Sequence, residues 1–509
     1  MAVATTYPRL LTMEEYEQSW KPQGWHLIII GPTSTWRQDW GEWEAIRDIV
    51  QNALDEAESY SYGYDKEGLW IMDNGRGIAV ADFLLGPPKL KPDWARGKFG
   101  EGMKIGALAL LRQGYSVHIK TVGRELWIVF LAQKVDSGKV DTLAALWRSS
   151  TRRRGTEFHI IGYSGPAFER YFAVNLPRSI ILAEVPSPLK GPKIRYNQLI
   201  RGVDSMAASP QGGVIYSRDI YLMDINSPFS YNLWGFELAP DRHGPKDESQ
   251  MHTDIGRVWA GVKDVTLLES FLRMVTDPPI HRTYESHRVS MDYMGREPLY
   301  GKHYNEIMLE NAQFWRKAWQ NAVGSNVVMR TTDRWDSMVK HIGYTSVNLY
   351  YGVRNALKGV IDDDEMLVAK SQESLKGVKI VPDNDLTPRA LAHLTLARII
   401  TKSFVTIDPP EIKAAIIPPA SDRARTQGMY ELETNRIYIA LDRLERFRNT
   451  IDVLVHELGH HVAYIQTQSR IQMEDLQPAH SDAMTFVAAG IFRRVAEKEY
   501  DPYLKDVVW

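Results

Sequence analysis

An acidic side chain and an amide side chain lie one helical turn apart near the N-terminus. Asp48, Asn52 and Asp55 follow one another at spacings of four and three residues, among apolar residues that repeat with helical periodicity. The segment 44–59 is therefore predicted to be an amphipathic helix that carries these three side chains on one stripe. A carboxylate and an amide at this spacing can orient a water molecule and hold a hard cation through oxygen. A solvated helix face is the alternative for this pattern alone.

A glycine-containing turn follows this helix in the sequence. The residues DNGRG, which contain Asp73, Gly75 and Gly77, come directly after the apolar stretch 69–72, a predicted buried strand. The Asp73 carboxylate can accept a hydrogen bond from an exocyclic amine such as that of adenine. The glycines let the backbone approach a ligand closely. An ordinary turn is the alternative, because Asp, Asn and Gly are common turn residues.

A second glycine-rich turn runs into another apolar helix. The sequence GKFGEGMK contains Gly97, Gly100, Gly102 and Lys104. A glycine-rich turn that opens a helix presents free N–H groups to phosphate. It matches neither a Walker loop nor a dinucleotide-binding loop, because no strand immediately precedes it.

The order of these three motifs resembles the GHKL ATPase superfamily, which includes gyrase, MutL, the heat-shock chaperone ATPases and the MORC proteins. A fourth element, RGTEFHI with Thr156, is similar to the late Gly-Thr strand of that family. The resemblance covers about residues 43–161. It implies a Bergerat α/β sandwich that binds ATP with Mg²⁺, and a lid whose closure can drive homodimerisation.

The resemblance also implies a role for each polar residue. Asn52 would hold the magnesium ion, Asp73 the adenine, and the glycines of the second turn the phosphates. The family usually carries Glu four residues before the Asn, as the base for the attacking water. This sequence has Asp48 there. The shorter side chain bears on the rate of ATP hydrolysis rather than on ATP binding.

The second set of reactive residues is HELGH, which begins at His456. In a helix, His456 and His460 share one face, where two imidazoles can bind one zinc ion, and Glu457 lies beside them to take a proton from water. The residues around this motif are apolar, as a buried active-site helix requires. His461 points away from that face and is expected near the metal ligands or on the surface. The strand RIYIA at 436–440 is predicted to be an edge strand that holds a peptide by β-addition.

The C-terminal residues 385–509 resemble HExxH peptidases of the gluzincin type, including the ImmA/IrrE-like group. Those proteins take a third zinc ligand from Glu-x-x-Ala on a later helix. The matching residues here are HSDA, so that His480 takes the ligand position. This departs from the family, and Asp482 or Glu474 is the alternative. His480 and Asp482 would point about 200° apart on a helix, so they cannot both face the metal.

The remaining patterns predict an α+β protein of four domains. These are a GHKL ATPase domain at 1–165, a transducer-like α/β domain at 166–300, a helical connector at 301–385 and a zincin-like metallopeptidase domain at 386–509. Paired strands at 213–216 and 219–223 indicate the transducer-like domain. Lys246 is placed where a transducer lysine would reach the γ-phosphate, and a surface lysine is the alternative.

The overall composition narrows the choice of partners. A formal net charge of -2 over 509 residues gives no general attraction to nucleic acid or membranes. The basic run at 152–154 is interpreted as a solvated turn, with a phosphate or nucleic-acid contact as the alternative. The absence of cysteine excludes disulfides, thiolate zinc sites and cysteine nucleophiles. With no signal segment and no long apolar run, we expect a cytoplasmic protein without a membrane partner.

Together these patterns predict an ATP-regulated zinc protease acting on a protein or peptide, with ATP, Mg²⁺ and Zn²⁺ as cofactors. The alternative is an ATP-switched clamp or chaperone-like machine that binds nucleic acid or a protein partner. Its zinc site would be structural or vestigial.

Overall fold

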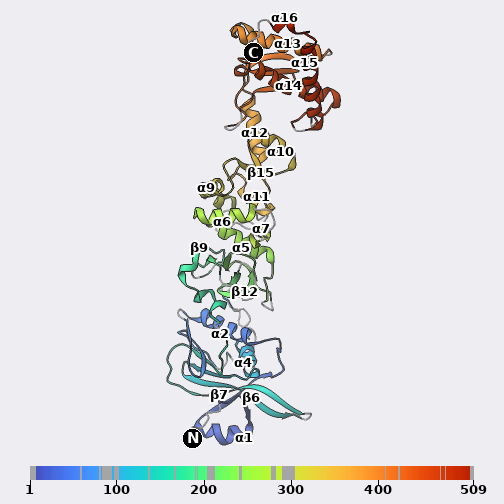
Figure 1. Ribbon diagram of the computed structural model, residues 1–509. Coiled ribbons are helices and arrows are strands. Elements are labelled where there is room, and N and C mark those ends of the chain that lie inside the picture. The colour runs from blue at the N-terminus through green and yellow to red at the C-terminus, as the bar shows by residue number, and fades with distance from the viewer. Residues whose placement is uncertain are drawn as a thin grey trace. The chain divides into compact units, whose positions relative to one another are not determined.

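The structure is a computed structural model with a mixed α+β fold and several sheets (Figure 1). It describes residues 7–57, 60–79, 82, 95–96, 102–135, 138–165, 168–189, 191, 193–202, 212–239, 243–276, 283–288, 304–406, 408–421, 425–470, 472–475 and 477–504. The chain divides into two compact units, residues 1–258 and 259–509. Among the described residues, none of the helices has the length and apolar character needed to cross a membrane.

The first unit is built on an N-terminal sheet with strand order β2-β7-β6-β5-β8-β4-β3, and β1 pairs in parallel with β6. Its strands are β1 (Leu10–Thr12), β2 (His26–Thr33), β3 (Tyr60–Tyr64), β4 (Gly68–Asp73), β5 (Ser116–Thr121), β6 (Arg124–Val135), β7 (Gly138–Ser149) and β8 (Glu157–Ile161). The strand-like segments 117–122 and 125–132, split by Gly123-Arg124, predict a hairpin. The prediction is confirmed, because β5 and β6 pair antiparallel.

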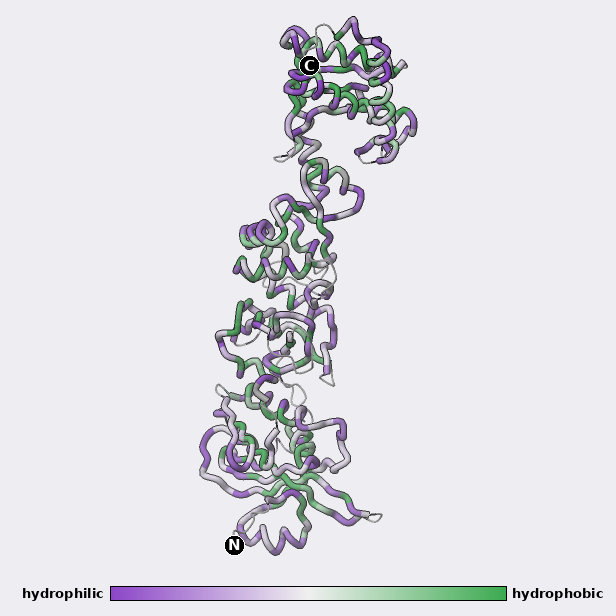
Figure 2. Tube along the Cα trace, viewed as in Figure 1, coloured by the Kyte–Doolittle hydropathy of each residue, from purple (hydrophilic) through white to green (hydrophobic). Residues whose placement is uncertain are grey.

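Figure 2 colours each residue by its hydropathy, and apolar residues (green) occur along the strands of this sheet. Their side chains pack on both of its faces. On β6, Ile128 and Phe130 belong to the main core, whereas Val129 and Leu131 join a smaller cluster on the other face. Successive side chains of a strand point to opposite faces, so a central strand with both faces covered reads as one apolar run.

Two helices contribute to the main core of the first unit. They are α2 (Glu42–Glu56), which the sequence placed at 44–59, and α4 (Gly102–Arg112). The Gly41 N–H donates to the Glu44 carboxylate at 2.8 Å, which caps the start of α2. Ile46 and Ile49 are buried in that core. The apolar face of α2 therefore fixes where its polar stripe lies.

A second sheet follows in the first unit, with strand order β12-β11-β13-β10-β9. Its strands are β9 (Ile181–Pro186), β10 (Tyr196–Arg201), β11 (Gly213–Ser217), β12 (Ile220–Ile225) and β13 (Phe229–Leu233). The predicted pairing of 213–216 with 219–223 is confirmed, because β11 and β12 form an antiparallel pair. Helix α5 (Glu248–Gly261) comes next in the chain.

The second unit begins with short helices and a small parallel sheet. Its first elements are α6 (Val265–Thr276), α7 (Tyr284–Arg288), α8 (Tyr304–Glu310), α9 (Ala312–Ala322), β14 (Val327–Met329), α10 (Asp336–His341), β15 (Thr345–Val347), α11 (Tyr351–Leu357) and α12 (Asp364–Leu375). The predicted helical connector at 301–385 contains α8 to α12, together with the short strands β14 and β15.

The C-terminal sheet has the strand order β16-β17-β19-β18. Its strands are β16 (Lys379–Val381), β17 (Glu411–Ile416), β18 (Gly428–Glu431) and β19 (Arg436–Ala440), and its helices are α13 (Pro388–Phe404), α14 (Phe447–Thr467), α15 (Pro478–Ala496) and α16 (Asp501–Leu504). The Thr387-Pro388 pair predicts the start of a helix, with Thr as its cap. Thr387 accepts a hydrogen bond from the Ala390 N–H, so this start of α13 is confirmed.

The prediction that RIYIA is an edge strand is wrong. That strand is β19, which pairs with β17 on one side and with β18 on the other. The edge strand is β18, the shorter segment before it. Apolar Ile437 and Ile439 belong to the core, as expected for an interior strand rather than for an edge.

Candidate metal centre and nucleotide site

Three histidines and one aspartate gather in the second unit. His456 and His460 lie on α14, His480 lies in the first turn of α15, and Asp475 lies between these helices. One donor atom from each residue lies within 4.8 Å of the other three. The structure thus brings together the HELGH histidines and the favoured third ligand. The alternative Asp482 is exposed and belongs to no such group within the described residues.

The close approach of two helices places His480 beside the HELGH motif. Leu454 and Leu458 of α14 and Val487 of α15 are buried in one core. A Cβ atom added to Gly459 would lie 2.6 Å from Met484 and 3.3 Å from His480. The glycine of HELGH is therefore needed for α15 to approach this closely.

Backbone carbonyls orient two of the three imidazole rings. The His460 Nδ1 donates to the Met473 carbonyl at 2.5 Å, and the His480 Nε2 donates to the His456 carbonyl at 3.3 Å. A ring nitrogen that donates to a carbonyl leaves the other nitrogen with a lone pair for a metal. The His460 Nε2 then faces the His456 Nε2 at 3.3 Å.

Burial keeps two of these histidines neutral near pH 7. Burial, together with the neighbouring His480, lowers the pKa of His460 to about 4. Burial also lowers the pKa of His480. A hydrogen bond with Asp475 raises the pKa of His456. Neutral imidazoles and a carboxylate are donors that suit zinc, so this set of residues fits the metal.

Glu457 lies beside the donors but does not belong to the group. Its Oε2 is 4.0 Å from the His460 Nε2, and the side chain is buried. A cleft of about 680 Å³ reaches His456, Glu457 and His460, and residues of β18 line it. A Cβ atom added to Gly428 would lie 2.9 Å from the Glu457 Oε1. The edge strand therefore passes directly beside the carboxylate.

His461 faces away from the metal ligands, as predicted, but it is not on the surface. It is 1% exposed, and its Nδ1 lies 3.0 Å from the Tyr430 hydroxyl of β18. Burial lowers its pKa. The residue joins α14 to the edge strand instead of contributing to the cluster.

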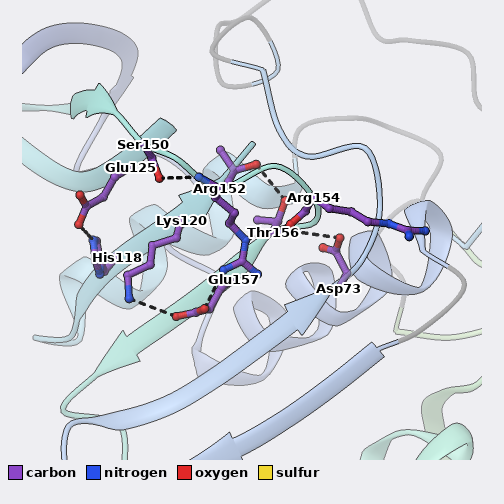
Figure 3. Close-up of polar contacts among 10 residues, drawn as sticks. Asp73, His118, Lys120, Glu125, Ser150, Arg152, Arg154, Thr156 and Glu157 are labelled. Carbon is purple, nitrogen blue, oxygen red and sulfur yellow. Dashed lines mark hydrogen bonds and ion pairs between the residues drawn. The ribbon is translucent and has the colours of Figure 1, made fainter. Parts of the chain in front are cut away.

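In the first unit, Asp73 and Thr156 meet at the ends of two paired strands (Figure 3). The Asp73 Oδ1 accepts hydrogen bonds from the Gly75 N–H at 2.8 Å and from the Thr156 N–H at 3.2 Å. Burial raises the pKa of Asp73, and these two hydrogen bonds oppose the rise. Residues that are far apart in the sequence thus form one polar corner.

Glycine and threonine hold the turn after β4. The Ile78 N–H donates to the Thr121 hydroxyl at 2.7 Å, and that hydroxyl lies 3.1 Å from the Thr156 hydroxyl. Gly77 has φ +85°, and a Cβ atom there would lie 2.6 Å from the Val122 side chain. A residue with a side chain would be both strained and crowded at this position.

The predicted catalytic and magnesium residues lie on α2, beside the start of α4. Asp48 is 3% exposed, and a Cβ atom added to Gly102 would lie 1.5 Å from its Oδ2. Asn52 lies one turn further along α2 and is partly exposed, and Lys104 of α4 is buried. The other two predicted phosphate-binding glycines, Gly97 and Gly100, lie outside the described residues.

The basic run supports the turn after β4. The Arg152 guanidinium pairs with Glu157 at 3.0 Å (Figure 3). The Arg154 Nε donates to the Asn74 carbonyl at 2.9 Å. Lys246, the predicted γ-phosphate contact, is largely exposed and pairs with Glu237 at 3.2 Å. That pairing agrees with the alternative of a surface lysine.

No protein-family model matches this chain, and no curated protein matches it. The two family resemblances therefore depend on the motifs and the geometry described above.

Proposed function

We propose that the C-terminal part of the chain is a zinc-dependent peptidase and that the N-terminal part is an ATPase of the GHKL type. The observation that carries the first half is the position of Glu457. It lies outside the group of metal donors, next to two of them, in a cleft bordered by an edge strand.

In the proposed peptidase, His456, His460 and His480 hold zinc. A bound zinc ion would polarise the carbonyl group of the substrate and make water more acidic. Glu457 takes the proton from the attacking water, because it is the buried carboxylate beside the donors. The free side of β18 receives the substrate in extended form through main-chain hydrogen bonds.

In the proposed ATPase, Asp73 recognises the adenine. Its Oδ1 is used by two backbone N–H groups, whereas its Oδ2 accepts no hydrogen bond from the described residues. The exocyclic amine of adenine can donate to that oxygen. Asn52 would hold magnesium, and Asp48 would orient the attacking water from the same helix.

Glu457→Gln tests the peptidase half of the proposal. We expect the full-length variant to retain one zinc ion per chain and to cleave an unfolded protein substrate about 10²–10⁴-fold more slowly, because it lacks the base. Glu497→Gln, an exposed position beyond α15, is the control and should cleave like the wild type. Equal cleavage by wild type and Glu457→Gln would reject the proposed mechanism.

One observation favours a second candidate function. The cluster holds four donors, and structural zinc sites have four protein ligands, whereas catalytic sites keep one position open. An ATP-switched clamp with a structural zinc would retain zinc and show no cleavage, either by the wild type or by a variant that lacks the Asp475 carboxylate.

A further inference from the structure

Asp475 adds a carboxylate to the three histidines that the peptidase needs. We propose that Asp475 is the fourth ligand of this metal centre and that it holds the peptidase latent by filling the position that water would need. The claim that the peptidase is latent rests on the proposed function, whereas the assignment of Asp475 as a ligand depends only on the geometry.

The carboxylate lies on the metal side of the imidazole rings. The Asp475 Oδ1 is 3.1 Å from the His456 Nε2, 3.5 Å from the His460 Nε2 and 3.7 Å from the His480 Nδ1. The same His456 and His460 nitrogens face each other at 3.3 Å. One carboxylate oxygen therefore points at the space toward which all three rings converge.

These separations suit four ligands around one ion. Zinc binds imidazole nitrogen and carboxylate oxygen at about 2.0–2.2 Å, so the donors of a tetrahedral site lie about 3.3–3.6 Å apart. Asp475 to each histidine, and His456 to His460, are separated by 3.1 to 3.7 Å, on both sides of that range. The carboxylate therefore lies at a ligand's distance from all three histidines.

A supporting role for Asp475 behind one of the rings does not fit this geometry. A carboxylate that orients a ligand histidine accepts from the ring nitrogen that does not bind the metal. In His460 and His480 that nitrogen already donates to the carbonyl groups of Met473 and His456. Asp475 faces the opposite nitrogens, so its place is that of a ligand.

Ligation by Asp475 has a direct consequence for the chemistry. Catalytic zinc sites have three protein ligands and an open position, whereas a four-ligand site is closed. With the carboxylate in place, Glu457 has no water to deprotonate at the metal. Rotation of the Asp475 side chain alone would open the fourth ligand position. His460 would keep its orientation, because the Met473 carbonyl that accepts its hydrogen bond belongs to the backbone.

The test uses the full-length protein loaded with Co²⁺, whose visible spectrum reports coordination. Three variants are compared with the wild type: Asp475→Ala, the isosteric Asp475→Asn, and Glu474→Gln as the adjacent control. Acetohydroxamate, a small metal-binding probe, should change the spectrum of Asp475→Ala and leave wild type and Glu474→Gln unchanged. Chelator competition should show at least about tenfold weaker metal binding in both Asp475 variants. Both should cleave an unfolded substrate faster than the wild type.

The outcomes separate the two proposals. A wild-type spectrum that responds to acetohydroxamate as strongly as that of Asp475→Ala would overturn the ligand assignment, as would unchanged metal affinity in Asp475→Asn. An open site in Asp475→Ala with no cleavage by any variant would keep the ligand assignment and reject the peptidase. Thermal melting identifies an unfolded variant, and the isosteric Asp475→Asn then decides.

Discussion

The proposed metal centre and the proposed nucleotide site differ in how the chain builds them. The four candidate metal donors are all side chains, and they come from one stretch between His456 and His480. The proposed nucleotide site uses residues from Asp48 to Thr156, and much of it consists of backbone N–H groups and glycines. Side chains at helical spacing can be recognised in one sequence. A site made from backbone geometry can be recognised only by its resemblance to a family.

The largest expected effect concerns the side-chain site. A His456→Ala/His460→Ala double variant should lose its zinc completely, because it removes two of the four donors. Metal analysis of the purified protein measures this directly. The control is His461→Gln, which alters a buried histidine of the same helix outside the cluster and should keep one zinc per chain. Full zinc occupancy in the double variant would contradict the proposed metal centre.

The second effect concerns the backbone-built site. Asp73→Asn removes the carboxylate and should weaken ATP binding by about 2 kcal/mol or more, which is about thirtyfold, by calorimetry. Asp65→Asn is a matched control, because the Asp65 Oδ1 also accepts two backbone N–H groups in a turn, those of Glu67 and Gly68. That variant should bind ATP like the wild type.

The same variant tests whether the two regions act together. If ATP regulates the protease, a non-hydrolysable ATP analogue should change the rate of cleavage in the wild type and leave Asp73→Asn unaffected. Identical cleavage with and without the analogue in the wild type would show two independent activities on one chain.

The smallest effect concerns close packing at the nucleotide site. Gly102→Ala would force a Cβ atom against the Asp48 carboxylate, so we expect a loss of about 1–3 kcal/mol of stability and a lower melting temperature. Gly244→Ala is the control, because a Cβ atom there meets no atom within 4 Å. Equal melting temperatures in the two variants would mean that α2 and α4 move apart at little cost.

Sequence patterns predicted the helices and strands better than they predicted which strands pair with each other. Helical periodicity located α2, and the Thr-Pro pair located the start of α13, because both signals act within a few residues. It was not predictable that β18, and not β19, lies at the sheet edge, since strand order depends on pairing between distant segments.

The proposed fourth metal donor was not predictable for a similar reason. The sequence offers Glu474 as an alternative ligand, but its neighbour Asp475 is the residue that reaches the histidines. Which of two adjacent carboxylates faces the metal depends on the backbone path between α14 and α15, and no periodicity describes that path. The hydrogen bond from Arg154 to the Asn74 carbonyl could not be predicted for the same reason, because it also depends on the path of the backbone.

The short span of the metal donors also bears on how the chain folds. His456 and His480 are 24 residues apart, so a metal ion that binds them closes a small loop between two consecutive helices. Closing such a loop is fast and costs little chain entropy, whereas the pairing of β16 with β17 joins Lys379 to Ile416 across a longer separation. We therefore expect metal to cross-link the helix pair before the C-terminal sheet is complete. The supply of metal during synthesis would then set the yield of folded protein.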